Sequence, residues 1–343
     1  MKIKIIPYTL FFKQAAGTSR GSYLEHKVWF VSIYSRQNPS QYGIGECAPL
    51  QGLSCDDLPN YEALLSEQCL KLQEEGALDV EALRPYPSML FGLETALQHL
   101  KSASLAFSNS AFAQGTEGIK INGLIWMGTH AEMFEQIKQK IAAGFACLKL
   151  KIGAIDFEQE LQLLHYIRKH FSANEIQLRV DANGAFKPAE ALEKLKRLSP
   201  FDLHSIEQPI AAGQWDEMTR LAAANIIPIA LDEELIGCHC QKEKEKLLSQ
   251  IAPQYIVLKP SLHGGIMGCS EWIKLAESKN IAWWATSALE SNIGLNAIAQ
   301  WVSTQNKILP QGLGTGALYT NNIPSPLILE RDVLYFNPHL SSF

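Results

Sequence analysis

The 343-residue sequence has no long apolar run, no strong charge of either sign and no ordered set of cysteines. No stretch approaches the roughly 18 apolar residues that a transmembrane helix needs, so we expect no membrane partner. The formal net charge of −5 gives no long-range attraction for nucleic acid. The seven cysteines are odd in number and irregularly spaced, which is typical of a reducing compartment rather than of a disulfide framework.

A secretory signal is not expected either. Lys2 and Lys4 precede an apolar stretch, but Pro7, Tyr8 and Thr9 interrupt that stretch, and no clear small-residue cleavage site follows it. The sequence therefore predicts a soluble, cytoplasmic protein.

Two regions of the chain differ in pattern. The first, residues 1–118, opens with strand-like segments and continues with helical patterns at residues 58–75 and 88–104. Strands followed by helices favour an α+β domain. Its last part, residues 108–118, is mostly small and polar and is typical of a linker.

From residue 119 onward, short apolar strands alternate with segments of helical period. This alternation predicts a parallel sheet that closes into a barrel with its helices outside. The expected strands are residues 119–122, 147–152, 176–180, 203–206, 227–231, 255–258, 281–285 and 308–309. The barrel then spans residues 119–317, and we expect residues 318–343 to return to the first domain.

Four charged residues end four successive predicted strands: Asp181, Glu207, Asp232 and Lys259. They are 26, 25 and 27 residues apart, which is about the length of one strand–helix unit. A single charge of this kind is more often a solvated strand end. The regular interval favours a shared site, because the carboxyl ends of barrel strands form the mouth where active sites lie.

The period-two pattern of a strand predicts where these side chains point. Lys149 and Lys151 share one face of their strand, and Asp181 and Glu207 lie opposite to apolar neighbours. The apolar faces must pack beneath the outer helices, so the charged faces point into the barrel. Burying three carboxylates with lysines is costly unless a cation completes their compensation. An all-oxygen set without His or Cys favours Mg²⁺, with Mn²⁺ as the alternative.

At these positions the sequence resembles the enolase superfamily, in its muconate-lactonizing-like subgroup and most of all in the o-succinylbenzoate synthase family. The resemblance covers nearly the whole chain and implies a modified (β/α)₇β TIM-type barrel with residues 1–118 as an α+β capping domain. The matching motifs are Gly43-Ile44-Gly45-Glu46, Lys149-Leu150-Lys151, Asp181-Ala182-Asn183, Glu207-Gln208-Pro209, Asp232-Glu233-Glu234 and Lys259-Pro260.

One position departs from the family pattern. Many relatives carry Ser after the Asp-Glu pair, whereas this chain has Glu234. Strand alternation places Glu234 on the same face as Asp232, so we expect it to support the metal site from outside the ligand set.

Members of the superfamily are known to use a Lys or His base with one or two Mg²⁺ ions, and remove a proton α to a carboxylate to give an enediolate. For this family the reaction is the dehydration of 2-succinyl-6-hydroxy-2,4-cyclohexadiene-1-carboxylate to 2-succinylbenzoate in menaquinone biosynthesis. The roles that the resemblance implies are metal ligation by Asp181, Glu207 and Asp232, acid–base catalysis by Lys151, electrostatic assistance by Lys149 and stabilisation of the enediolate by Lys259.

Substrate binding is also inferred from the resemblance. Relatives contact the far end of the substrate with the ends of strands seven and eight and with a mobile loop of the cap. The candidates here are Ser287, Gly314, Asn183 and Arg20. Arg20 lies in a Gly- and Ser-rich segment, residues 15–22, which suits a lid. A solvated loop charge is an equally good interpretation of Arg20.

Other activities of the superfamily remain open. Dipeptide epimerases place acidic residues on strand eight, and residues 311–320 contain no acid. N-succinylamino acid racemisation and cycloisomerisation need the same paired lysines and stay as alternatives. A non-catalytic metal–carboxylate binder would not need opposed lysines. The expected partner is a small carboxylate substrate, and a homo-oligomer is possible because relatives often form one.

Overall fold

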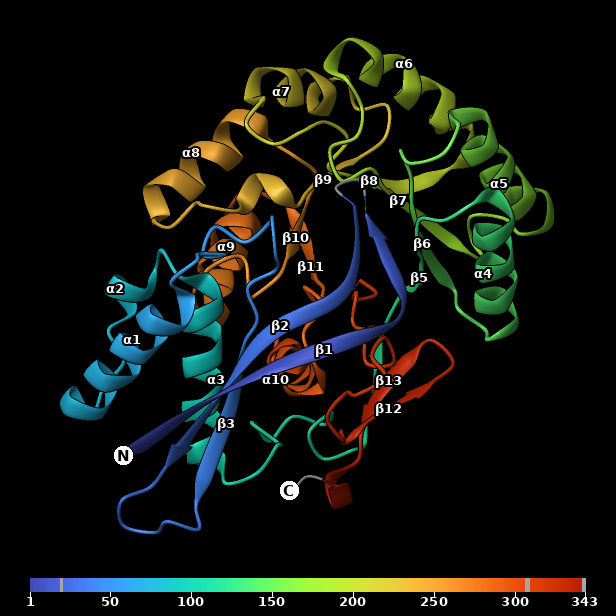
Figure 1. The fold of residues 1–343 in the computed structure, drawn as a ribbon. Helices are drawn as coiled ribbons and strands as arrows, with labels where there is room; N and C mark the ends of the chain where they lie inside the picture. Colours follow the sequence, from blue (N-terminus) through green and yellow to red (C-terminus); the bar gives the residue numbers. More distant parts are fainter. Residues whose placement is uncertain (19–20, 306–308, 341–343) are drawn as a thin grey trace.

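The computed structural model describes residues 1–18, 21–305 and 309–340. The chain begins with an antiparallel sheet of three strands in the order β1-β2-β3: β1 (Lys2–Thr18), β2 (Gly21–Tyr34) and β3 (Tyr42–Cys47). Figure 1 shows β1 and β2 as a long hairpin that crosses the molecule and reaches the barrel.

The tip of this hairpin falls in the segment for which a lid was predicted, and its role as a lid stays a prediction. Residues 15–22 were expected to form a lid loop, but Gly17 pairs with Ser22 and Thr18 pairs with Gly21 across the hairpin. Because their backbone groups are paired in this way, most of the segment is strand. Arg20 lies outside the described residues, so its expected role in substrate binding stays a prediction.

Three helices cover the sheet: α1 (Tyr61–Glu75), α2 (Val80–Leu83) and α3 (Pro87–Ser102). The glycines of β3 explain how closely α3 approaches it. A methyl group at Gly43 or Gly45 would overlap the backbone carbonyl oxygens of Ala96 and Gly92 on α3. These glycines therefore allow backbone-to-backbone packing within the cap.

Seven parallel strands follow in the spatial order β11-β10-β9-β8-β7-β6-β5. Two isolated parallel bridges, Ile121 to Gln311 and Thr286 to Gly312, complete the ring and stand for a very short eighth strand. The (β/α)₇β barrel predicted from the sequence is confirmed. Its strands are β5 (Gly123–Ile125), β6 (Cys147–Lys151), β7 (Gln177–Asp181), β8 (Leu203–Glu207), β9 (Ile229–Leu231), β10 (Tyr255–Leu258) and β11 (Ala282–Ala285).

The first and last barrel strands differ from their predicted positions. In place of residues 119–122, the chain forms β4 (Ile119–Lys120), which pairs with β13, and then β5, which pairs with β6. The eighth strand is reduced to Gln311 and Gly312, later than the predicted residues 308–309, of which residue 308 lies outside the described part of the chain. The first segment is divided between two sheets, and the eighth strand has only two single bridges. A pattern of apolar residues in the sequence reveals neither arrangement.

Helices alternate with the barrel strands, and Figure 1 shows α4 to α8 as an arc outside them. They are α4 (His130–Ala142), α5 (Phe157–His170), α6 (Pro188–Leu198), α7 (Trp215–Ala224), α8 (Gln241–Ile251), α9 (Gly265–Ser278) and α10 (Asn292–Ser303), with short 3₁₀ turns at η1 (Ser199–Phe201), η2 (Glu233–Leu235) and η3 (Pro338–Leu340). Within the described residues, no helix combines the length and the apolar character that crossing a bilayer demands.

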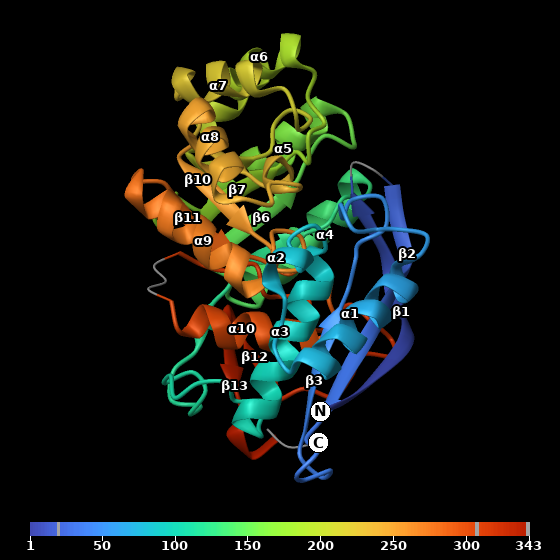
Figure 2. The ribbon, with the colours of Figure 1, turned by 90° about the vertical axis from the view of Figure 1, so that its left-hand side faces the viewer.

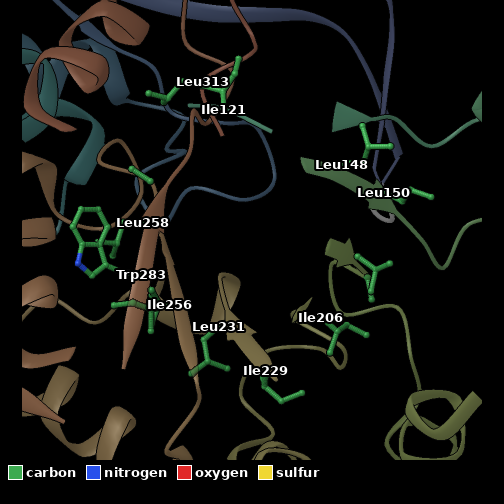
Figure 3. Close-up of a cluster of buried hydrophobic side chains, with 14 of the residues drawn as sticks. Ile121, Leu148, Leu150, Ile206, Ile229, Leu231, Ile256, Leu258, Trp283 and Leu313 are labelled. Atoms are coloured by element: carbon green, nitrogen blue, oxygen red, sulfur yellow. The ribbon is translucent and has the colours of Figure 1, made fainter. Parts of the chain in front are cut away.

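The core lies between strands and helices. Leu148 and Leu150 of β6 and Ile256 and Leu258 of β10 belong to one large buried cluster, part of which is drawn in Figure 3. Because strand residues alternate between two faces, the residue between each of these pairs points to the barrel interior. On β6 that residue is Lys149.

The end of the chain contacts both parts of the molecule. Strands β12 (Leu327–Glu330) and β13 (Val333–Phe336) form a hairpin that pairs with β4. Just before it, Tyr319 forms a bridge with Phe12 of β1. Figure 2 shows β1 and β2 along one side of the molecule, with α5 to α8 at its far end.

A half-buried carboxylate of the cap contacts the barrel at α9. Glu94 of α3 accepts hydrogen bonds from the backbone amides of Ile266 and Met267, at 2.7 and 3.2 Å. These amides belong to the first turn of α9, where backbone donors lack partners within the helix. The cap thus supplies the N-terminal partner of a barrel helix.

Candidate active site

Three neighbouring strands bring a lysine and two carboxylates together inside the barrel. Lys149 Nζ of β6 lies 3.0 Å from Asp181 Oδ2 of β7 and 2.6 Å from Glu207 Oε2 of β8. All three side chains are at least nine-tenths buried. Their place at the carboxyl ends of successive strands follows from the parallel register, in which Lys151 pairs with Asp181 and Asp181 with Glu207.

Lys151, the second lysine of β6, lies two residues further along the strand and is therefore closer to the mouth of the barrel. Lys151 Nζ is 3.1 Å from Asp181 Oδ2 and donates a hydrogen bond of 2.7 Å to Asn183 Oδ1. The ring of Trp126 lies on the same side, with its centroid 5.9 Å from Lys151 Nζ. Lys151 is therefore held between a carboxylate, an amide and an aromatic ring.

On the opposite side of the barrel, Lys259 forms an ion pair with Asp232. Lys259 follows β10, which is the sixth barrel strand, whereas Lys151 ends the second. Strands two and six of an eight-stranded ring face each other. The two lysines therefore approach the same cavity from opposite walls, and both of them line it.

The charges strongly affect one another. Burial alone would lower the pKa of Lys149, but Asp181 and Glu207 outweigh burial and raise it. Burial acts to raise the pKa of Asp181, whereas Lys149 and Lys151 overcome it and lower that pKa. Burial and repulsion from Asp181 raise the pKa of Glu207 well above its ordinary value. For Glu207, the nearby lysines do not compensate for burial and for the charge of Asp181.

The same residues are candidates for a metal site. Within the described ranges, no three His, Cys, Asp or Glu side chains surround one point closely enough to ligate a metal as they stand. Lysine ammonium groups lie between the carboxylates instead. Two buried oxygens, Glu207 Oε1 and Asp232 Oδ1, have no hydrogen-bond partner among the residues that the structure describes. Unpaired oxygens in a cluster of carboxylates are suitable ligands for a hard divalent cation.

The cavity above this cluster measures about 790 Å³, its opening to solvent included. Its charged lining is Lys149, Lys151, Asp181, Glu233 and Lys259. The cap and the barrel both contribute to its remaining wall, which consists of Tyr23, Leu50, Leu53, Asn122, Leu124, Trp126, Asn183, Leu262, Thr286, Ser287, Ala288, Leu289, Gly312, Gly314 and Thr315.

Of the substrate-binding residues expected from the sequence, Asn183, Ser287 and Gly314 line this cavity. The hydroxyl of Ser287 is already in use, since it donates a 2.6 Å hydrogen bond to Glu290 Oε2 and accepts one from the backbone of Leu289. The side chain of Ser287 is therefore fixed by the protein.

The interpretation of Glu234 rested on strand alternation, and that reasoning fails here because β9 ends at Leu231 and a 3₁₀ turn follows. Glu234 does not line the cavity. It accepts hydrogen bonds from Gln208 Nε2 at 3.0 Å and from the backbone of Gly213 at 2.7 Å. Gln208 in turn accepts from the backbone of Asp232, so Glu234 supports Asp232 through Gln208.

Several cavity residues were missed from the sequence. Glu233 lines the cavity and accepts a 3.0 Å hydrogen bond from Asn183 Nδ2. Asn122 and Trp126 line the opposite wall, just before and just after β5, the first barrel strand. The first predicted strand, residues 119–122, ends at the uncharged Asn122, so the pattern of charged strand ends does not include it. A search for any polar or aromatic residue at a strand end would have found both.

Comparison with known proteins agrees with this geometry. The family model described as enolase C-terminal domain-like matches residues 132–333. An o-succinylbenzoate synthase from Desulfotalea psychrophila is 45% identical, and the match covers 95% of this chain and 96% of that protein.

Solved structures give the same picture. The crystal structure of MenC from Desulfotalea psychrophila superposes with a TM-score of 0.83 at 40% identity, over 98% of this chain and 99% of that one. A dipeptide epimerase from Enterococcus faecalis, solved with Mg and the dipeptide L-Leu-L-Tyr, gives a TM-score of 0.80 at 18% identity, over 99% of each chain, which shows a shared fold. With opposed lysines and three carboxylates at the mouth of a (β/α)₇β barrel, this chain belongs to the enolase superfamily.

Proposed function

We propose that this protein is an o-succinylbenzoate synthase, a lyase that removes water from a cyclohexadiene carboxylate bearing a succinyl group. The observation that carries the proposal is the pair Lys151 and Lys259, which line one cavity from opposite walls above three carboxylates. The 45% identity to the Desulfotalea synthase over nearly the whole chain supports this choice within the superfamily.

Asp181, Glu207 and Asp232 are proposed to hold one divalent cation, Mg²⁺. The unpaired oxygens of Glu207 and Asp232 support this assignment, as does the hard, all-oxygen character of the set. When bound, the ion supplies Lewis-acid stabilisation to the substrate carboxylate as negative charge develops there.

Lys151 is proposed as the acid–base residue. Its amine takes the proton from the ring carbon next to the carboxylate, and the electron pair of that C–H bond moves into the enediolate. The C–O bond on the neighbouring carbon then breaks, and Lys151 returns its proton to the departing hydroxide, which leaves as water. Asn183 and Asp181 orient the Lys151 amine through contacts of 2.7 and 3.1 Å. The product ring is aromatic, which drives the reaction.

Lys259 and Lys149 are proposed to act through charge. Lys259 faces the substrate from the wall opposite Lys151, so its ammonium stabilises the enediolate without exchanging a proton with it. Lys149 lies deeper, bonded to both Asp181 and Glu207, and holds these carboxylates in place. Apolar residues of the cap, Leu50 and Leu53, cover the cavity and strengthen these interactions by excluding water.

The reaction itself is the test. Purified protein is mixed with the cyclohexadiene substrate, and formation of 2-succinylbenzoate is followed by its absorbance, with Mg²⁺ and after treatment with a chelator. We expect turnover that requires the added cation. No formation of 2-succinylbenzoate under any metal condition would refute the proposed function.

A second candidate is racemisation of N-succinylamino acids, because Lys151 and Lys259 can each reach one face of an α-carbon. In D₂O, a racemase incorporates deuterium at the α-carbon of an N-succinylamino acid, which proton NMR detects as loss of the α-proton signal. If no N-succinylamino acid in a panel of such compounds exchanges its α-proton, the racemase activity is refuted and the dehydration remains the supported activity.

We also propose that the protein works in the cytoplasm on a small soluble carboxylate. Its seven cysteines are all free thiols, which agrees with a reducing compartment.

A further inference from the structure

Two polar side chains in the cavity wall lack partners. Asn122 is 4% exposed and Thr315 is 6% exposed, and both line the cavity. Neither Asn122 Oδ1 nor Thr315 Oγ1 has a hydrogen-bond partner in the described part of the chain. Buried polar atoms are rarely left without partners, because desolvation costs free energy that nothing returns. These two atoms therefore point to a ligand group that the cavity is built to receive.

The other hydroxyls of this wall are not available in the same way. Ser287 Oγ donates to Glu290 Oε2 at 2.6 Å, and Thr286 Oγ1 donates to the carbonyl oxygen of Gly312 at 2.9 Å. The hydroxyl proton of each of these two residues is therefore already donated to a group of the protein. Thr315 keeps its proton, and the amide of Asn122 can present either its oxygen or its NH₂ group by turning about its last bond.

The position of the pair follows from the order of the strands. Asn122 precedes β5, the first barrel strand, and its backbone amide donates to Gln311 of the eighth strand at 2.9 Å. Thr315 follows that eighth strand. The pair thus marks the seam between strands one and eight. In a ring of eight strands this seam lies opposite strands four and five, which end in Glu207 and Asp232.

The charges of the cavity are distributed unevenly. Its charged lining residues all come from strands two, three, five and six. The lining at the seam is neutral, with Asn122, Gly312, Gly314 and Thr315. A ligand whose carboxylate is held near Glu207 and Asp232 therefore extends its other end toward uncharged hydrogen-bond donors.

We propose that Asn122 and Thr315 form the subsite for the oxygen atoms of the substrate's non-reacting side chain. The assignment rests on the proposed dehydration for the identity of that side chain, a succinyl group with a ketone and a carboxylate. The Thr315 hydroxyl and the Asn122 amide donate hydrogen bonds to its oxygens. Recognition of the distal group then depends on these two side chains rather than on the hydroxyl of Ser287.

Two isosteric variants test the subsite, Thr315→Val and Asn122→Leu. In the presence of Mg²⁺, calorimetry measures binding of 2-succinylbenzoate and of benzoate, which lacks the distal group. Each variant should bind 2-succinylbenzoate about tenfold more weakly, the effect of one lost hydrogen bond, while its affinity for benzoate stays within about twofold of the wild type. In the turnover assay KM should rise by a similar factor, with kcat changed much less.

Controls separate the subsite from folding. Thr315→Ser keeps the hydroxyl and should restore the wild-type affinity for 2-succinylbenzoate. Thr219→Val removes a hydroxyl on α7, far from the cavity lining, and should change neither affinity. Thermal unfolding identifies any variant that is not folded, and the comparison with benzoate cancels a general loss of binding.

The outcomes distinguish this inference from the proposed function. If the wild type does not aromatise the cyclohexadiene substrate, the proposed function fails, while the two ligands still report on the subsite. If Thr315→Val and Asn122→Leu keep the wild-type ratio of the two affinities, the subsite is refuted even for an active enzyme. A wild type that binds benzoate as tightly as 2-succinylbenzoate refutes it as well.

Discussion

Glu46 holds Ser291 at two points: its carboxylate accepts a 2.7 Å hydrogen bond from the Ser291 amide and one of 2.6 Å from the Ser291 hydroxyl. A third bond, 2.8 Å long, comes from the amide of Gly294. Glu46 belongs to β3 of the cap, whereas Ser291 is the N-cap of α10 in the barrel. A fully buried carboxylate at a helix N-terminus therefore joins the two parts of the chain.

This joint should make stability depend on pH. Burial raises the pKa of Glu46 to about 7, against the hydrogen bonds from Ser291, which lower it. Because the folded-state pKa lies above the unfolded value, the associated stability is fully present below about pH 4.5 and is lost as the pH rises through 7. The free energy of unfolding of Glu46→Gln, measured with urea, should therefore vary less between pH 5 and 8 than that of the wild type.

The size of the Glu46 effect is limited by its pKa shift, which corresponds to about 3 kcal/mol. Glu193→Gln, at an exposed position on α6, is the matched control and should keep the wild-type pH profile. An unchanged profile in Glu46→Gln would show that its carboxyl titrates alike in the folded and unfolded chain.

Removing the amine of Lys151 should abolish turnover without unfolding the protein. Loss of a general acid–base residue typically costs about 10²- to 10⁴-fold in rate, so kcat of Lys151→Ala should fall by at least about 10²-fold. Circular dichroism should stay native. Lys138→Ala, which removes an exposed lysine of α4, should retain full activity. Substantial dehydration by Lys151→Ala would mean that another group takes the proton.

Glu207→Gln should weaken the response to metal. The substitution keeps the size of the side chain but removes one negative charge from the proposed ligand set. After treatment with a chelator and readdition of Mg²⁺, the concentration that restores half of the activity should rise by about tenfold or more. If that concentration is the same in the wild type and the variant, Glu207 does not contact the metal.

Gly45→Ala should weaken the cap. Its new methyl group would overlap the backbone carbonyl of Gly92, so β3 and α3 would have to separate. We expect a loss of more than about 2 kcal/mol in the free energy of unfolding. Gly213→Ala is the comparison, because no atom lies within 4 Å of its added methyl group and only the positive φ of 88° is unfavourable. It should cost about 1 kcal/mol.

The central barrel strands could be predicted because each is a short apolar run that ends at a charge. The start of α6 could be predicted as well, since Pro188 at its first position suits a helix N-terminus. The eighth strand could not, because it consists of two single bridges. A segment with so few ladder bonds leaves no apolar pattern in the sequence.

The spacing of charges along the chain brought the lysines and carboxylates to attention, and the structure gathers them around one cavity. The neutral residues of that cavity gave no such signal. Asn122 is a single polar residue beside a short strand, which resembles many surface positions. The position of Glu234 could not be derived from alternation, because alternation is valid only while the strand lasts and β9 stops before it.

The cavity wall takes Tyr23, Leu50 and Leu53 from the cap, and every charged group from the barrel. Neither the cap nor the barrel forms the whole binding cavity, so the cavity is complete only while the two are in contact. We therefore expect conditions that separate the cap from the barrel, at the Glu46–Ser291 contact and at the bonds from Glu94 to α9, to abolish activity. Loss of activity on heating should consequently occur no later than loss of the contact between the two parts.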